Sequence, residues 1–285
     1  MVRKYLTEHI AKLDPVRDHQ EILYLLTCHI FPWDIERSLE FALFRTFAVQ
    51  SISELLVQTG EFKQRTRKRY DDTELLLYEL VENGYDSERG RRALRRINQM
   101  HGRFSISNAD FLYVLSTFVY EPIRWIDHYG WRPLTQNEKL AFFYYYREIA
   151  RRMNIKDLPV DFEEFERFNV KYENEHFRFA ATNREIGELT RDLLLGFYLP
   201  KLLWPIGKPF VYTFMDRLLL DAMGFPHPPP ILSKIGAAGL RARGWFIKRL
   251  PERRSPVLGT RRKRPTYPRG YEIEELGTFP RSSWR

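Results

Sequence analysis

The segment SNADFLYVLSTFVYEPIRWIDHYG, residues 107–130, is long and mostly apolar. Its length and composition predict a buried α-helix, and Gly130 falls where such a helix should stop. Pro122 lies inside the segment and predicts a kink, because its ring clashes with the preceding turn and it has no amide hydrogen to donate. A helical core is therefore the starting point for the fold.

Helical patterns continue after this segment. Thr135 and Glu138 have the spacing of a capping box, in which two side chains satisfy free amides of the first turn, and Thr182 and Glu185 repeat that spacing. Asp161 is placed to cap a further helix. No convincing run of alternating strand positions and no internal repeat occur along the chain. The sequence therefore predicts an all-α protein of about ten helices without a sheet.

Composition and cysteine usage narrow the class of protein. Of the 285 residues, 44% are hydrophobic and 15% aromatic, which is enough to build a large core and excludes intrinsic disorder of the body. The single cysteine, Cys28, excludes an intrachain disulfide and an all-cysteine metal site. The N-terminus shows no signal peptide, and the apolar stretch 193–207 is interrupted by Pro200 and Lys201. We expect an intracellular protein, cytoplasmic or peripheral to a membrane.

The positive charge is concentrated at the C-terminal end. Residues 234–285 contain 14 Lys and Arg against four Glu, whereas residues 1–233 contain 32 basic and 33 acidic side chains. We expect a compact catalytic domain over residues 1–245 and an extended, basic, Pro- and Arg-rich tail over 246–285. Two alternatives stay open for the tail: weak contact with an anionic membrane, or folding back onto acidic residues of the body. No zinc-finger, homeodomain or RNA-recognition pattern accompanies the charge, which argues against a nucleic-acid partner.

Standard catalytic motifs are absent, but one histidine has a distinctive setting. Leu94, Ile97, His101 and Phe104 are three or four residues apart and share a helical face. A histidine on an apolar face needs partners for both ring nitrogens. One partner could be a haem iron, and the alternative is a core histidine bonded to a carbonyl or hydroxyl group. Spacing alone favours the core histidine.

Arg69 and Thr73 form a second polar pair, four residues apart on a helical face that continues through apolar leucines. An arginine at the end of an apolar stripe can enter a pocket and bind a propionate, a carboxylate or reduced oxygen. The alternative is a surface arginine paired with Asp72. Without other information this surface pairing is favoured.

The stretch from 69 to 155 resembles the MpaB family of oxygenases, which includes a fungal enzyme of mycophenolic acid biosynthesis and, more distantly, the latex-clearing rubber oxygenases. The matching pieces are R-x-x-x-T at Arg69–Thr73, R-x-N-x-x-H ending at His101, and the strings ISNADF, FVYEPIRW and GWR. The resemblance extends over residues 40 to 240, roughly the length of one large domain.

This resemblance implies a single globin-like multi-helix domain that binds haem b. His101 would ligate the iron, and Arg69 and Thr73 would be the catalytic residues, orienting oxygen or anchoring a propionate. Arg124 would be a weaker partner for a propionate. The implied chemistry is dioxygen-dependent oxidation or cleavage of a carbon–carbon double bond in a hydrophobic, isoprenoid-type substrate. The alternative function is a non-catalytic helical protein that binds haem or lipid at membranes.

The sequence departs from the family pattern at three points. A lysine found before the threonine in some rubber oxygenases is Asp72 here, so a closed state with lysine on iron is not expected. An acidic residue proposed as a base in that branch has only a loose counterpart, Glu54. The membrane anchor of the fungal branch is also expected to be missing from this chain.

Overall fold

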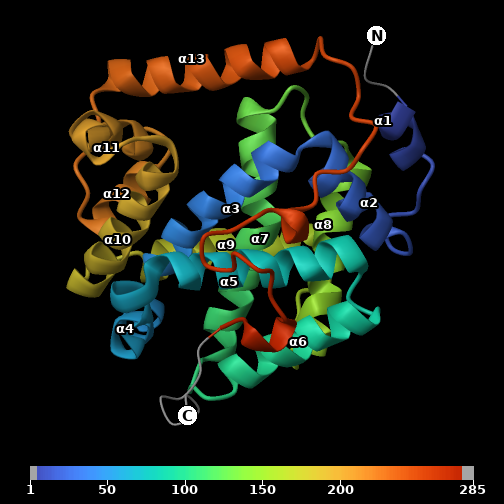
Figure 1. Cartoon of the computed structure of the whole chain (residues 1–285), viewed down its shortest axis with the longest axis horizontal. Helices are drawn as coiled ribbons and strands as arrows, with labels where there is room; N and C mark the ends of the chain where they lie inside the picture. The colour runs from blue at the N-terminus through green and yellow to red at the C-terminus, as the bar shows by residue number, and fades with distance from the viewer. Residues whose placement is uncertain (1–4, 278–285) are drawn as a thin grey trace.

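The computed structural model describes residues 5–277, and within this range it contains α-helices and short helical turns but no β-strand (Figure 1). The α-helices are α1 (Tyr5–Ile10), α2 (His19–Leu25), α3 (Pro32–Phe47), α4 (Gln50–Thr59), α5 (Glu61–Asn83), α6 (Glu88–His101), α7 (Asn108–Tyr129), α8 (Gln136–Arg152), α9 (Phe162–His176), α10 (Ala181–Tyr198), α11 (Trp204–Tyr212), α12 (Arg217–Met223) and α13 (Pro230–Ile247). The all-α prediction is confirmed.

Helix α7, which contains most of the segment 107–130, is the central helix. It contacts α3, α8, α9 and α13. Its Tyr113 and Tyr120 are completely buried, and the Tyr120 hydroxyl donates a hydrogen bond to the Phe162 carbonyl oxygen at 2.5 Å. The predicted stop at Gly130 is confirmed, and the helix continues through Pro122. Contacts with helices on several sides explain why most of this sequence is hydrophobic.

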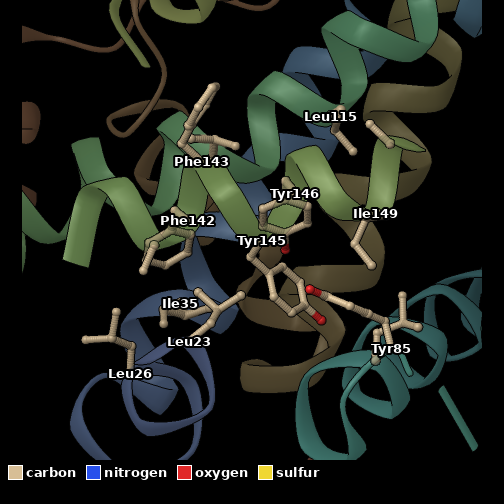
Figure 2. Close-up of a cluster of buried hydrophobic side chains, with 14 of the residues drawn as sticks. Leu23, Leu26, Ile35, Tyr85, Leu115, Phe142, Phe143, Tyr145, Tyr146 and Ile149 are labelled. Atoms are coloured by element: carbon tan, nitrogen blue, oxygen red, sulfur yellow. The ribbon is translucent and has the colours of Figure 1, made fainter. Parts of the chain in front are cut away.

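A cluster of aromatic and aliphatic side chains joins α2 and α8 (Figure 2). Leu23 and Leu26 meet Phe142 from α8, while Tyr145 points toward Tyr85. All five side chains are buried. Full burial of one such side chain stabilises the fold by about 1.5–3 kcal/mol. This packing holds α8 in place beside α7.

The predicted helix caps have mixed outcomes. The Thr135–Glu138 capping box and the Asp161 cap are both confirmed. The Thr182 cap is wrong, because α10 already begins at Ala181 and the Thr182 hydroxyl instead lies 2.8 Å from the hydroxyl of Ser53. The start of α10 is fixed by Asn183, whose buried side chain binds backbone carbonyls from three separate segments. These hydrogen bonds to other segments take the place of a side-chain cap within the first turn.

Residues 256–277 form a C-terminal strap that packs on the helical body. The strap crosses α5 and ends beside α6 (Figure 1). Near its start the Val257 amide donates to the Cys28 carbonyl oxygen at 2.8 Å, and near its end Ile273 and Leu276 are buried in the main core. Of the two alternatives that the sequence leaves open for the tail, these residues adopt the folded-back one.

The strap's basic run, 261–264, alternates between paired and solvent-exposed side chains. Arg262 pairs with Glu36, and the buried Arg264 pairs with both Asp71 and Glu74. Arg261 and Lys263 are exposed. Part of the C-terminal positive charge is therefore neutralised inside the molecule.

Across residues 5–277, none of the helices combines the length and the apolar character that crossing a lipid bilayer requires. The apolar stretch 193–207 is divided among the end of α10, a short 3-10 turn at Lys201–Leu203 and the start of α11.

Candidate functional site

A cavity of about 640 Å³ lies among α4, α5, α6, α7 and α8 and is closed on further sides by α3 and α10. Its walls are mainly apolar, and this volume falls within the range of about 300–1,000 Å³ typical of small-molecule and cofactor sites. The polar and titratable side chains on the wall come chiefly from α5 and α8, with single residues from α6, α7 and the loop after α6. They are Arg69, Tyr70, Thr73, His101, Arg103, Asp110, Glu61, Tyr145 and Tyr146, together with small hydroxyl residues of α3, α4 and α10.

His101 is the last residue of α6 and lines this cavity. Ile97, one turn earlier, and Phe104 line it too, as expected from the shared helical face. The Nδ1 atom of His101 is buried and has no hydrogen-bond partner anywhere in residues 5–277. Burial, followed by the positive charge of Arg69, lowers the pKa of His101 to about 4. The ring is therefore a neutral imidazole near pH 7, which is the form that binds metals.

Arg69 and Thr73 face the same cavity from α5. The Arg69 Nη1 donates to the Thr73 hydroxyl oxygen at 2.5 Å, and that hydroxyl donates to the Arg69 carbonyl oxygen at 3.0 Å. Burial lowers the pKa of Arg69, although Asp72 and Glu61 oppose this effect. An arginine stays protonated despite such a shift. The pair thus presents a fixed positive charge at the cavity wall.

Asp72 is not the partner of Arg69. Its buried carboxylate binds Lys68 at 2.7 Å and accepts a hydrogen bond from Tyr267 of the strap. The alternative of a surface Arg69–Asp72 pair therefore does not describe this structure, and the position that carries lysine in some rubber oxygenases faces the strap here.

A smaller chamber of about 60 Å³ adjoins the cavity, and Tyr70 and Thr73 line both spaces. Glu40 of α3 lies in this chamber and accepts a hydrogen bond from the Tyr70 hydroxyl at 2.9 Å. Arg37 lies 2.9 Å from the same carboxylate. Burial outweighs the attraction of Arg37 and raises the pKa of Glu40 to about 8. Sequence reasoning missed this carboxylic acid, because no local pattern distinguishes Glu40 from other acidic residues of α3.

Arg124 and Glu54 are not part of the described cavity wall. The Arg124 guanidinium binds Glu121 at 2.9 Å and the Asn169 side-chain oxygen at 2.8 Å. Glu54 accepts a hydrogen bond from Gln50 at 2.6 Å, one turn away on the same helix. The structure thus brings together three of the five residues singled out in the sequence, namely Arg69, Thr73 and His101.

Asp110 is a cavity residue to which the sequence assigned no role, although it belongs to the ISNADF string. Its carboxylate accepts hydrogen bonds from the Ser51 hydroxyl at 3.0 Å and the Tyr172 hydroxyl at 2.7 Å. Glu61 also reaches the cavity and is paired with Arg65. The backbone of α5 is distorted at Arg65, with φ −143° and ψ 44°, one turn before Arg69.

Comparison with known proteins supplies independent evidence on the family. Residues 34–247 match the model of the family described as "ER-bound oxygenase mpaB/B'/Rubber oxygenase, catalytic domain". The chain is 32% identical over 246 residues to a Penicillium brevicompactum protein named ER-bound oxygenase mpaB', covering 80% of this chain and 58% of that protein. It is also 32% identical over 211 residues to ER-bound oxygenase mpaB of Penicillium roqueforti, covering 68% of this chain and 70% of that protein.

The matched range begins in α3 and ends in α13, so it contains the whole cavity wall. The chain spans less than two thirds of the length of the Penicillium brevicompactum relative. Because residues 34–247, which include the whole cavity wall, match the family model, this chain belongs to the MpaB and rubber oxygenase catalytic-domain family.

Proposed function

We propose that this chain is a haem-dependent oxygenase that uses dioxygen to oxidise or cleave a carbon–carbon double bond of a hydrophobic, isoprenoid-type substrate. The observation that carries the proposal is a neutral, unpartnered histidine in a largely apolar cavity of cofactor size. The names of the relatives, ER-bound oxygenases, support the same class of reaction.

The donor set of the cavity fits a haem better than a bare metal ion. No group of three or more His, Cys, Asp or Glu side chains within residues 5–277 is placed to hold an ion. A haem would need little from the protein, since the porphyrin itself supplies most of the iron's ligands and one histidine would suffice to hold the group. His101, with an unpaired Nδ1 and a ring kept neutral by burial, meets that requirement.

The side chains around the site would have separate tasks. When bound, haem iron would supply the redox chemistry that activates dioxygen. His101 would hold the group, and Arg69 would bind a propionate or stabilise negative charge that develops on oxygen. Thr73 keeps the Arg69 guanidinium in one conformation through its hydrogen bond. The leucine, isoleucine and phenylalanine side chains of the wall would bind the apolar substrate and exclude water.

The absorption spectrum of the purified chain, followed by oxygen uptake, tests this proposal. A Soret band together with oxygen consumption that depends on an added polyprenyl compound is the expected result. A Soret band without substrate-dependent oxygen uptake would favour a non-catalytic haem-binding protein. Purified protein that neither contains nor takes up haem would overturn the proposed cofactor.

A further inference from the structure

Helix α13 lies along the outer edge of the molecule, where it contacts α7 and α11 (Figure 1). The face that it turns to solvent is apolar, since Ile231, Ile235, Trp245 and Phe246 are each between 54% and 65% exposed. At helical spacing these four residues fall on one side, together with the exposed small residues Ala238 and Ala242. A helix on the surface of a soluble domain usually has the opposite arrangement, with its polar face outside.

The opposite side of α13 is held by close contacts of its glycines. A side chain at Gly236 would meet the hydroxyl of Thr213 at 2.9 Å, and one at Gly244 would meet the Gly130 carbonyl oxygen at 3.0 Å. These close approaches fix which side of the helix faces the body. The exposure of the apolar face is therefore a consequence of how the helix is anchored, with its large side chains outside.

The charged side chains of α13 itself are all positive. Lys234 and Arg241 are exposed beside it, and no Asp or Glu occurs in the sequence between Asp221 and Glu252. At the C-terminal end, the Arg249 guanidinium lies 3.3 Å from the centre of the Trp245 ring.

Exposed apolar side chains continue next to α13. Helix α11 contacts α13 and the 3-10 turn that precedes it. Leu202 in that turn is 87% exposed, Ile206 of α11 is also exposed, and the neighbouring Lys201 again adds a positive charge. Both elements therefore expose apolar side chains together with basic ones, a mixture that is typical of elements lying in the plane of a membrane interface.

We propose that the outer face of α13, formed by Ile231, Ile235, Trp245 and Phe246 with Lys234 and Arg241, docks on an anionic lipid surface. The apolar side chains enter the boundary between head groups and acyl chains, and the basic side chains bind the lipid anions. Charge complementarity favours this occupant over a second copy of the chain, because α13 has basic but no acidic side chains and two such helices repel each other. The proposal goes beyond the proposed function and does not depend on haem or on the reaction.

Flotation of the full chain with lipid vesicles tests the proposal. Wild type should float with mixed phosphatidylcholine–phosphatidylserine vesicles, less at high salt, and much less with phosphatidylcholine alone. The double variant Trp245→Ser/Phe246→Ser should lower the partition coefficient at least about tenfold. Lys234→Glu/Arg241→Glu should remove most of the salt-sensitive binding. A matched control, Val160→Ser/Val170→Ser, removes exposed apolar side chains on α9 and its preceding loop and should bind like wild type.

Three outcomes would overturn the proposal. One is equal flotation of Trp245→Ser/Phe246→Ser and wild type, with circular dichroism showing both folded. The second is binding of wild type that is the same on neutral and anionic vesicles. The third is a dimer of wild type, detected by light scattering, that becomes a monomer in the Trp245→Ser/Phe246→Ser variant, since this result would assign the face to a second copy.

Discussion

Arg69 and Thr73 show how two side chains on one helix can be arranged for chemistry at a cost in stability. Burial disfavours the charged guanidinium, and no salt bridge in the described part of the chain involves Arg69. A neutral hydroxyl is its hydrogen-bonding partner, so the positive charge stays available to a ligand in the cavity. An arrangement of this kind is typical of functional sites.

Replacing either member of this pair should affect turnover more than folding. We expect Arg69→Ala and Thr73→Val each to reduce the turnover number by roughly 10- to 100-fold. The first variant removes the positive charge that stabilises developing negative charge, and the second removes the hydrogen bond that orients the Arg69 guanidinium. Melting temperatures should stay within a few degrees of wild type, and Thr73→Ser, which keeps the hydroxyl, should retain most activity. Wild-type oxygen uptake by both Arg69→Ala and Thr73→Val would assign the pair to structure.

Glu40 should make stability depend on pH. Its carboxylate faces Arg37 and the Tyr70 hydroxyl, with Glu36 and Glu74 also near it. Because its pKa is raised from 4.5 to about 8, the native state holds a proton that the unfolded chain has already released. The stability contributed by neutral Glu40 is therefore complete below pH 4.5 and is lost as the pH rises to about 8.

The variant Glu40→Gln, which cannot ionise, isolates this effect. Relative to wild type, it should become more stable as the pH rises from acidic to mildly alkaline values, by at most about 5 kcal/mol. Urea denaturation of both proteins across this pH range measures the difference. Parallel stability curves for the two proteins would show that Glu40 keeps an ordinary pKa.

The sequence could predict where a helix starts when the residues that cap the helix lie within its own first turn. Thr135, Glu138 and Asp161 bind amides within their own first turn, so short-range spacing is sufficient to identify them. The start of α10 depends on Asn183 and on carbonyls far away in the sequence, which no local pattern contains. The fold-back of the strap likewise follows from ion pairs between residues about 190 positions apart.

The strap offers a test in which neighbouring basic residues have different roles. Arg264 is buried against Asp71 and Glu74, whereas Lys263 is exposed. Arg264→Ala should lower the free energy of unfolding by roughly 3–5 kcal/mol, since it leaves the largely buried Glu74 carboxylate without its ion-pair partner and removes one of the two arginines paired with Asp71. Lys263→Ala should change it by less than about 0.5 kcal/mol. Equal effects in thermal or urea unfolding would show that the strap is held by general charge attraction.

For the molecule as a whole, the fold class followed from the sequence more fully than the site did. Helical periodicity predicts which residues share a face, but it does not place the Arg69 face of α5 opposite the His101 face of α6. The family resemblance supplied that pairing, and the cavity brings both residues into one space. Spacing could not show that Arg124 binds Asn169 outside this wall, or that Asp110 and Tyr70 belong to it.

The central claim is that His101 holds a haem in this cavity, and a haem titration of purified variants tests it most directly. His128 serves as the matched control, because it is exposed and its Nδ1 lies 2.7 Å from the Arg124 carbonyl oxygen. We predict that His101→Ala loses the wild-type ferric spectrum and full haem occupancy, that added imidazole partly restores the spectrum, and that His128→Ala behaves like wild type. Full haem occupancy and an unchanged ferric spectrum in His101→Ala would contradict the account.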